Sequence, residues 1–384
     1  MNAINTTDLR PGQVFTEPVY TEGKYLLVAA EVPLRQKDID VLISWGIEIV
    51  KTEGTLVDLD KQAEDQQDGQ KSVVFSISDV QENSVPYRSY KHLIERLNMV
   101  FTNLKSGEDV EMNALDNICV QLLQDLRDYP NNFVEYILGG EIIGNELAKS
   151  SVNTAILSAM TAQELKLPNH KIHNIVAGAL LHDVGMLRLS KGITEKKGGL
   201  SEAELEQIKS HPVHTSKIVT KELFGPHEVN LIAIQHHERW DGQGYPDKIS
   251  GQDIDIGARI VSVADAFEAM VSKKSYRNSL VGYQAIKNLM ADNARRFDPA
   301  VIMAFTKIIG IYPIGSIVQM NGNIIARVVS VHSNAPMRPI IQMLTDGKGE
   351  ALDPGQDAVV DLLVDKTLFI KHAIDPEEYA KKNQ

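Results

Sequence analysis

Four histidines and two aspartates stand in segments of helical pattern and are of the residue types that bind metal ions. They are His182, Asp183, His211, His236, His237 and Asp265. Each residue alone is weak evidence, because a His followed by an Asp is as often a hydrogen-bonded pair at a helix end. Taken together, the six residues predict a metal centre.

The adjacency of His182 and Asp183 indicates how many ions this centre holds. Neighbouring side chains on a helix diverge by about 100°, so the two residues do not easily chelate one ion, whereas Asp can bridge two ions while His binds one. The sequence therefore predicts a dinuclear site. Two ions about 3.5–4 Å apart share and deprotonate a bridging water, and they stabilise the attacking and leaving oxygens of a phosphoester displacement. Imidazole and carboxylate ligands without thiolate suit Fe or Mn.

Two further segments have the residue types of a substrate site. The run HHERWDGQGYP at 236–246 has glycines and a proline that enforce a turn, and Tyr245 adds a ring and a hydroxyl. Such a turn alone is typical of a structural loop, but next to two adjacent histidines it becomes a candidate substrate or partner surface. A basic cluster formed by Lys273, Lys274 and Arg277 suits phosphate oxygens, or else it is a solvated helix end.

The order of these motifs carries a resemblance. The series is HD at 182–183, HP at 211–212, HHERWDGQGYP at 236–246, and ARIVSVADAFEAM followed by SYR within 258–277. It resembles the HD-GYP family of cyclic-di-GMP phosphodiesterases over about residues 133–310, somewhat under half of the chain. The resemblance implies an all-helical HD-superfamily core with a metal centre that hydrolyses cyclic-di-GMP to linear pGpG, with GMP as a further product.

The resemblance also implies a role for each matching residue. His182, the bridging Asp183 and Asp265 would hold one ion, and His211, His236 and His237 would hold the second, while His182 and Asp183 form the catalytic HD pair. In members with three ions, a glutamate at the position of Glu146 is a further ligand. Lys274 and Arg277 match phosphate-contacting positions. The signature loop Gly244, Tyr245 and Pro246 would bind substrate and offers a contact for diguanylate cyclase (GGDEF) proteins.

Two residues depart from the family pattern. Ser150 stands where the family usually has a further His, and a hydroxyl is a poor ligand for Fe or Mn, so two ions are expected rather than three. Met186 stands where the family usually has a Lys that would bind phosphate or protonate the leaving oxygen. The loss of such a cation costs about 2–4 kcal/mol, or about 10²–10³ in rate, if nothing replaces it. Slow catalysis is therefore expected.

The departures leave two alternatives open. One is a catalytically weak or inactive receptor that binds cyclic-di-GMP or a partner, although the retention of six metal ligands argues against it. The other is a hydrolase of a related cyclic dinucleotide. A competition assay between cyclic-di-GMP and the related dinucleotide distinguishes the latter from a phosphodiesterase specific for cyclic-di-GMP.

The rest of the chain supplies the elements that must position these residues. Apolar residues recur at helical spacing from Tyr87 to near Ile309, strand-like runs make a β-β-α-β unit before about residue 58, and short β-rich runs follow Pro313. The predicted fold is mainly α, an HD-superfamily core with a small α+β N-terminal domain and a β-rich C-terminal region. The expected domains are an N-terminal domain at 1–60, a linker at 61–86, a helical connector at 87–130, the catalytic domain at 131–312 and the C-terminal region at 313–384.

Two amphipathic helices are expected within 87–127. Their apolar stripes either pair between subunits of a homodimer or pack on the catalytic core. The N-terminal domain shows no ligand fingerprint, and its position before these helices favours a regulatory role.

Composition excludes several classes of protein. The 384 residues suffice for two or three domains, and the 39 basic against 51 acidic residues, a net charge of −12, disfavour binding to bulk nucleic acid. The single cysteine, Cys119, excludes intramolecular disulfides and Cys-x-x-Cys redox chemistry. No signal sequence and no apolar run of membrane-spanning length are present, so a cytoplasmic protein without membrane attachment is expected.

Overall fold

A computed structural model describes most of the chain. The described residues are 2–10, 13–17, 19–21, 26–28, 34, 39, 42, 49–56, 84–129, 132–139, 144–194, 196, 198–272, 282–292, 295–350, 352 and 358–374. By its internal contacts the chain divides into two compact units. One comprises residues 1–73 with 351–358 and 384, and the other comprises 74–350 with 359–383.

The second unit is mainly helical. Its α-helices are α2 (Val85–Ser106), α3 (Met112–Asp128), α4 (Asn132–Gly139), α5 (Glu146–Glu164), α6 (Asn169–Leu181), α7 (Lys191–Thr194), α8 (Glu202–Lys209), α9 (His211–Lys217), α10 (His227–Gln235), α11 (Ile256–Val271), α12 (Gly282–Ala291) and α13 (Pro299–Ile309). Shorter helical turns are η3 (Val184–Arg188), the π-helical η4 (Ile218–Glu222) and η5 (Gly251–Asp253).

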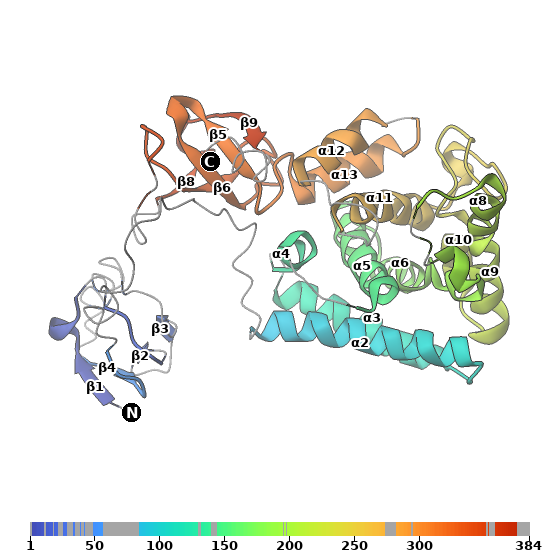
Figure 1. Ribbon diagram of the computed structural model, residues 1–384, viewed down its shortest axis with the longest axis horizontal. Coiled ribbons are helices and arrows are strands. Elements are labelled where there is room, and N and C mark those ends of the chain that lie inside the picture. Colours follow the sequence, from blue (N-terminus) through green and yellow to red (C-terminus); the bar gives the residue numbers. More distant parts are fainter. Residues whose placement is uncertain are drawn as a thin grey trace. The chain divides into compact units, whose positions relative to one another are not determined.

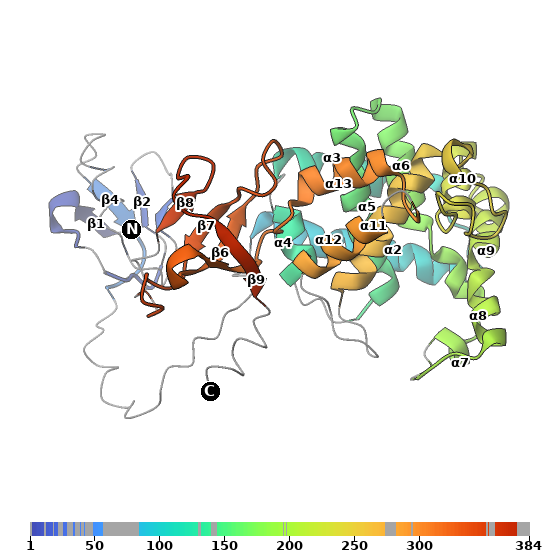
Figure 2. The same cartoon turned by 90° about the horizontal axis from the view of Figure 1, so that it is seen from above.

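The helices α5, α6 and α11 form the centre of this unit (Figure 1). Twelve residues of α5 are buried, including Ser151, Asn153 and Thr154, so this helix is covered on nearly all sides. A helix buried all round packs against neighbours rather than facing solvent. In Figure 1, α13 lies above this central group and α2 lies below it, so that α2 is seen partly behind α11 in the view from above (Figure 2). The mainly helical fold predicted from the sequence is confirmed.

The two amphipathic helices of the predicted connector are α2 and α3. Their apolar positions, among them Leu97, Phe101 and Leu122, lie in one continuous core with residues of α5, α6 and α11. Ser84 caps α2 by accepting a hydrogen bond from the Tyr87 amide at 3.3 Å. Of the two arrangements that the sequence left open for the stripes, packing on the core is the one found.

The N-terminal unit contains a four-stranded antiparallel sheet in the order β1-β4-β2-β3. Its strands are β1 (Asn2–Asn5), β2 (Val19–Thr21), β3 (Leu26–Val28) and β4 (Ile49–Thr52), and η1 spans Thr6–Asp8. Ile39 and Leu42 are helical and buried, in agreement with the helix of the expected β-β-α-β unit. The predicted unit lacked β1, because Asn2–Asn5 has no apolar alternation that distinguishes it from a loop.

The C-terminal strands form a five-stranded antiparallel sheet in the order β8-β7-β6-β5-β9. The strands are β5 (Ile317–Met320), β6 (Ile325–Ser330), β7 (Ile340–Met343), β8 (Val359–Asp361) and β9 (Ile370–Ile374), with η6 at Asn321–Asn323. Each strand falls within one of the five β-rich runs recognised in the sequence. Val318, Met320 and Val328 are among its fully buried core residues.

The domain boundaries expected from the sequence stay predictions, and the expected linker at 61–86 lies mostly outside the described residues. Of the helices that the structure describes, none combines the length and the apolar character needed to cross a membrane.

Candidate metal centre

Five of the six predicted ligands lie at helix ends or directly after them, whereas Asp265 lies inside α11. His182 follows the last residue of α6, His211 begins α9, and His236 follows the last residue of α10. Asp183 has backbone angles of φ −103° and ψ 4°, outside the α-helical region. The expectation that both adjacent pairs sit within helices is wrong in this respect. Because the chain turns at these points, consecutive side chains are free of the helical divergence and face one site.

The six predicted ligands form two groups that share Asp183. One group contains His182, Asp183 and Asp265, and the other contains Asp183, His211, His236 and His237, with ligand atoms within 4.8 Å of one another in each. Asp183 Oδ1 lies 3.0 Å from Nε2 of His211, and its Oδ2 lies 3.5 Å from Nε2 of His182. The two oxygens of one carboxylate thus face different groups, which is the geometry of a bridging ligand.

Three imidazoles are oriented by backbone carbonyls of the helix that precedes each of them, α6, α8 and α10. Nδ1 of His182, His211 and His236 lies 2.8, 2.8 and 2.9 Å from the backbone carbonyl three residues earlier. A carbonyl only accepts, so each Nδ1 carries the proton and each Nε2 is left to face the site.

The Nε2 atoms in turn lack protein donors. Nε2 of the buried His182 has no hydrogen-bond partner, and Nε2 of His211 lies 3.2 Å from Nε2 of His236. Two facing lone pairs repel unless a proton or a cation lies between them. These nitrogen and carboxylate atoms therefore fit divalent metal ions.

The pKa values of the histidines in the two groups are shifted in opposite directions. Burial lowers the pKa of His236 well below its ordinary value, and burial with the neighbouring His211 lowers the pKa of His237 to about 3. Both rings are therefore neutral. Burial alone would lower the pKa of His182, but the adjacent carboxylates Asp183 and Asp265 outweigh it and raise that pKa to about 9. In the absence of metal, a proton on His182 balances the two carboxylates.

The turn after His182 is held to α9 by Thr215, which belongs to none of the motifs recognised in the sequence. The hydroxyl of Thr215 donates to the carbonyl of His182 at 3.0 Å and accepts from the amide of Gly185 at 2.9 Å. A Cβ on Gly185 would come within 2.2 Å of the His211 carbonyl oxygen. Glycine thus lets the segment that carries His182 approach the segment that carries His211.

The loop after His237 returns to the metal ligands. The ring of Tyr245 stacks on the His237 ring, with 4.8 Å between centroids and 25° between planes. Burial, followed by the carboxylates of Asp183 and Asp265, raises the pKa of Tyr245, so its hydroxyl stays protonated. The carboxylate of the buried Glu238 holds the loop, because Oε1 accepts from the amides of Asp247 at 2.6 Å and of Lys248 at 3.0 Å.

Gly244 lies close to the backbone at the beginning of that loop. A Cβ at this position would lie 2.4–2.6 Å from the backbone of residues 237–239. Pro246 follows the stacked tyrosine and is half-buried. The Gly-Tyr-Pro loop therefore packs directly on the segment that carries His236 and His237.

Other predicted site residues are not in the two groups. Glu146 is exposed at the first turn of α5. Lys274 and Arg277 lie outside the described residues. Ser150 donates a hydrogen bond to Oε2 of Glu268 at 2.6 Å.

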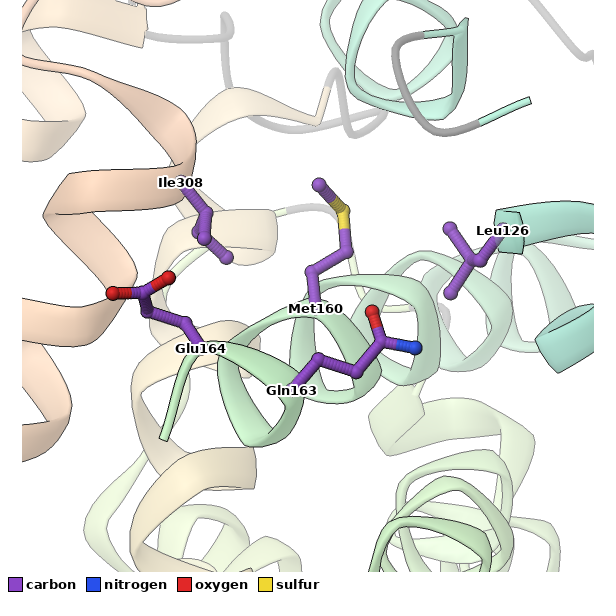
Figure 3. A pocket seen from close by; sticks show the side chains of 5 residues that line it. All are labelled: Leu126, Met160, Gln163, Glu164 and Ile308. Atoms are coloured by element: carbon purple, nitrogen blue, oxygen red, sulfur yellow. The ribbon is translucent and has the colours of Figure 1, made fainter. Parts of the chain in front are cut away.

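A cavity elsewhere in the helical unit has a different character. It is lined by Leu126, Met160, Gln163, Glu164 and Ile308, with Met160 between Ile308 and Leu126 (Figure 3). This cavity differs from the centre around Asp183. Its surface is mainly apolar, and Glu164 is the one residue of a metal-binding type in its lining.

Comparison with known proteins adds two domain matches. Residues 140–301 match an HD domain, and residues 317–382 match a KOW domain associated with HD domains. The HD match contains all six residues of the two groups, and the second match contains the five-stranded sheet.

Curated relatives are similar over differing shares of the chain. The cyclic di-GMP phosphodiesterase PdeB of Borreliella burgdorferi is 28% identical over 77% of this chain and 78% of its own length. The cyclic di-GMP phosphodiesterase PA4108 of Pseudomonas aeruginosa is 30% identical over 55% of this chain, and the 3'3'-cGAMP-specific phosphodiesterase 2 of Vibrio cholerae is 30% identical over 48%. These two alignments cover 50% and 35% of the relatives. Among solved structures, the HDG"Y"P protein Bd1817 from Bdellovibrio bacteriovorus has a TM-score of 0.49 and 18% identity, over 80% of this chain and 98% of that one.

Proposed function

The chain carries an HD domain of the HD-GYP type, and we propose that it is a metal-dependent phosphodiesterase that hydrolyses cyclic-di-GMP to linear pGpG. The observation that carries this proposal is the pair of ligand groups that share Asp183. Curated relatives named as cyclic di-GMP phosphodiesterases support the choice of substrate. The catalytic domain is proposed to span residues 131–312.

The proposed cofactors are two divalent ions, Fe or Mn. His182, Asp183 and Asp265 would hold one ion, and His211, His236 and His237 would hold the other with Asp183 as the bridge. When bound, the ions supply an activated water and neutralise charge that develops on the phosphate. The chain's own contribution is orientation, because the carbonyls behind the Nδ1 atoms fix three imidazole rings before any ligand arrives.

Substrate contacts are proposed for the Gly-Tyr-Pro loop and for the segment after α11. The Tyr245 hydroxyl stays protonated near the site, so it can donate a hydrogen bond to a phosphate or ribose oxygen. Gly244 and Pro246 hold this ring against His237. Lys274 and Arg277 are proposed to pair with phosphate oxygens.

A count of two ions rather than three is supported by the surroundings of Ser150. Its hydroxyl donates to Glu268, which is 1% exposed. That carboxylate also accepts from Asn153 and Ser272, at 3.2 and 2.5 Å. Three protein donors satisfy Glu268 without a cation, and Glu146 belongs to neither of the metal-ligand groups found among the described residues.

The loop also offers a surface for protein partners. Gln243, Asp247 and Lys248 are exposed on it. We propose this rim as the contact for GGDEF proteins. A homodimer, if formed, would use surfaces other than the apolar stripes of α2 and α3, which are covered within the chain.

A second candidate substrate is 3'3'-cGAMP, because a relative at 30% identity is named for its hydrolysis. It shares the 3'-5' phosphodiester with cyclic-di-GMP and differs in one base. Competition between the two dinucleotides at equal concentration decides which has the higher kcat/KM.

The test of the proposed function is turnover. The protein is purified anaerobically with Fe(II) or Mn(II), the metal per chain is measured, and the products of cyclic-di-GMP are separated by chromatography. Accumulating pGpG with about two ions per chain is expected. Bound metal and measurable dinucleotide affinity without turnover would instead establish a receptor.

A further inference from the structure

Trp240 fixes the loop that follows His237 to two other segments of the chain. Its amide donates to the carbonyl of Arg296, in the turn before α13, at 3.0 Å. Its carbonyl accepts from the amide of Gly251, the first residue of η5, at 3.1 Å. Both backbone groups of one residue are thus hydrogen-bonded across the loop, so the Gly-Tyr-Pro loop is anchored at this point.

The side chain of Trp240 is in contact with Arg259 of α11. The guanidinium carbon of Arg259 lies 5.7 Å from the centroid of the indole ring, which is within the range of a cation–π contact. Nη1 of Arg259 donates to Oδ2 of the buried Asp298 at 2.7 Å, and Oδ1 of Asp298 accepts from the amide of Ala300 at 2.8 Å. Because this carboxylate also caps α13, the guanidinium under the indole ring is tied to two helices.

The anchored loop brings Tyr245 to the ligand groups. The amide of Tyr245 donates to the carbonyl of His237 at 3.2 Å, and the two rings are stacked. Asp265, which belongs to the other ligand group, lies on α11 as Arg259 does. Arg259 therefore connects the helix that carries one ligand group to the loop that lies against the other.

We propose that Trp240 and Arg259 are positioning residues that hold the Gly-Tyr-Pro loop where it binds the dinucleotide. This inference rests on the proposed function, since it needs a cyclic dinucleotide that contacts the loop. A loop that leaves its place is competent to bind for only a fraction of the time, and the apparent affinity falls by that fraction. The step after binding is unchanged, because the loop is in place in every complex that forms.

The test determines KM and kcat for cyclic-di-GMP separately in Trp240→Leu and Arg259→Lys. Leucine keeps the backbone hydrogen bonds without the ring, and lysine keeps a cation for Asp298 without the planar guanidinium. Loss of the contact between the two side chains is expected to raise KM by about 3- to 30-fold and to change kcat by less than about threefold. Trp240→Phe retains a ring beside Arg259, so its KM is expected to lie close to that of the wild type.

Tyr312→Leu and Arg338→Lys are the matched controls. The Tyr312 ring stacks on Tyr283 with 5.2 Å between centroids, and Nη1 of Arg338 donates to a backbone carbonyl at 3.0 Å within the C-terminal region. These variants lose an aromatic contact and a guanidinium away from the loop, so KM is expected to stay within about twofold of the wild type. Metal content and melting temperature are measured for every variant.

Three results would overturn the inference. They are an unchanged KM in Trp240→Leu and Arg259→Lys, an equal rise of KM in the two controls, and a fall of kcat at unchanged KM. If Trp240→Leu loses metal or does not fold, Arg259→Lys and the fluorescence of Trp240 decide the question.

This fluorescence is a measurement that does not depend on activity. The chain has two tryptophans, Trp45 and Trp240, so Trp45→Phe leaves Trp240 as the single one. Quenching of its emission by acrylamide is expected to increase in Arg259→Lys, because the ring is held less firmly, and to decrease again when cyclic-di-GMP is added. Equal quenching with and without the guanidinium would contradict a positioning role for Arg259.

The same titrations separate the inference from the proposed function. If the wild type binds cyclic-di-GMP without hydrolysing it, the proposed function fails, and dissociation constants from Trp240 emission replace KM in the comparison of variants with controls. If the wild type hydrolyses the dinucleotide and all variants resemble it, the inference fails and the proposed function stands. If the wild type binds neither cyclic-di-GMP nor 3'3'-cGAMP, both are wrong.

Discussion

Asp265 and Glu268 lie three residues apart on α11, and their carboxyl groups are satisfied in opposite ways. Oδ1 of Asp265 lies 3.5 Å from Nε2 of His182, and three imidazole Nε2 atoms gather in the same site. Glu268 instead accepts hydrogen bonds from Ser150, Asn153 and Ser272. The first region has acceptors in excess of donors and so needs cations, whereas the second is complete with protein donors alone.

The comparison shows that the partners of a carboxylate, and not its place on the helix, decide whether it faces the candidate metal centre or is hydrogen-bonded within the core. Residues three apart share one face of a helix, so position on α11 does not distinguish Asp265 from Glu268. Their partners do, because Nδ1 of His182 is engaged with a backbone carbonyl and its Nε2 must give up any proton to bind an ion, while serine and asparagine retain their donors. The two regions should therefore respond in different ways to mutation, to metal and to pH.

The largest effect is expected at the bridge between the two ligand groups. Asp183→Asn removes one bridging oxygen and one negative charge, so bound metal should be lost and kcat/KM should fall by at least about 10³-fold. Metal analysis and turnover of cyclic-di-GMP measure both. Asp292→Asn, which removes a partly exposed carboxylate paired with Arg295, is the control and should retain both. Full activity in Asp183→Asn would contradict the proposed centre.

Glu268→Gln should affect folding rather than metal binding. Glutamine replaces one carboxylate oxygen with an NH2 group, so a donor faces groups that themselves donate, which should lower the free energy of unfolding by about 1–3 kcal/mol. Denaturant titration measures this loss, and about two ions per chain should remain. Glu164→Gln, which breaks a 3.4 Å ion pair with the partly exposed Lys307, should cost less than about 1 kcal/mol. Loss of both ions in Glu268→Gln without loss of stability would show that the two regions are not separate.

Metal affinity should depend on pH through His182. Its pKa is raised to about 9 without metal, so its proton must leave when an ion binds. The affinity should fall by about tenfold for each pH unit below 9, and about one proton should be released at pH 7.5. Calorimetric titration with Mn(II) in two buffers of different ionisation enthalpy counts that proton. The release should vanish above about pH 10, and zero release at pH 7.5 would contradict a protonated His182.

The smallest effect is expected where the region around Glu268 reaches α2. The hydroxyl of the buried Tyr90 donates to Oδ1 of Asn153 at 2.6 Å, and Asn153 in turn donates to Glu268. Tyr90→Phe should lower the free energy of unfolding by about 1 kcal/mol and leave metal content unchanged. Thermal denaturation with metal analysis measures both quantities. An unchanged melting temperature would mean that this hydrogen bond adds nothing to stability.

The sequence allowed much of the fold to be predicted because periodicity is a local property. Helical spacing from Tyr87 to Ile309 and the five β-rich runs after Pro313 correspond to observed elements. The strand at Asn2–Asn5 was not predictable, since its pairing with Ile49–Thr52 and not its own composition makes it a strand. Likewise, the apolar stripes of α2 and α3 indicated burial but not the surface that covers them.

The candidate site, like the fold, was predictable from the sequence only in part. The types and order of His182, Asp183, His211 and the residues that follow are written in the sequence, because imidazole and carboxylate chemistry belongs to the residue itself. The sequence thereby determined the chemistry that the chain can support. Only the tertiary structure decided which groups meet: that the hydroxyl of Ser150 donates to Glu268 across 118 residues, and that the carbonyl of Arg296 accepts a hydrogen bond from the amide of Trp240. These contacts join helix ends and turns from distant segments, and such proximity results from packing of the whole core, which no local pattern encodes.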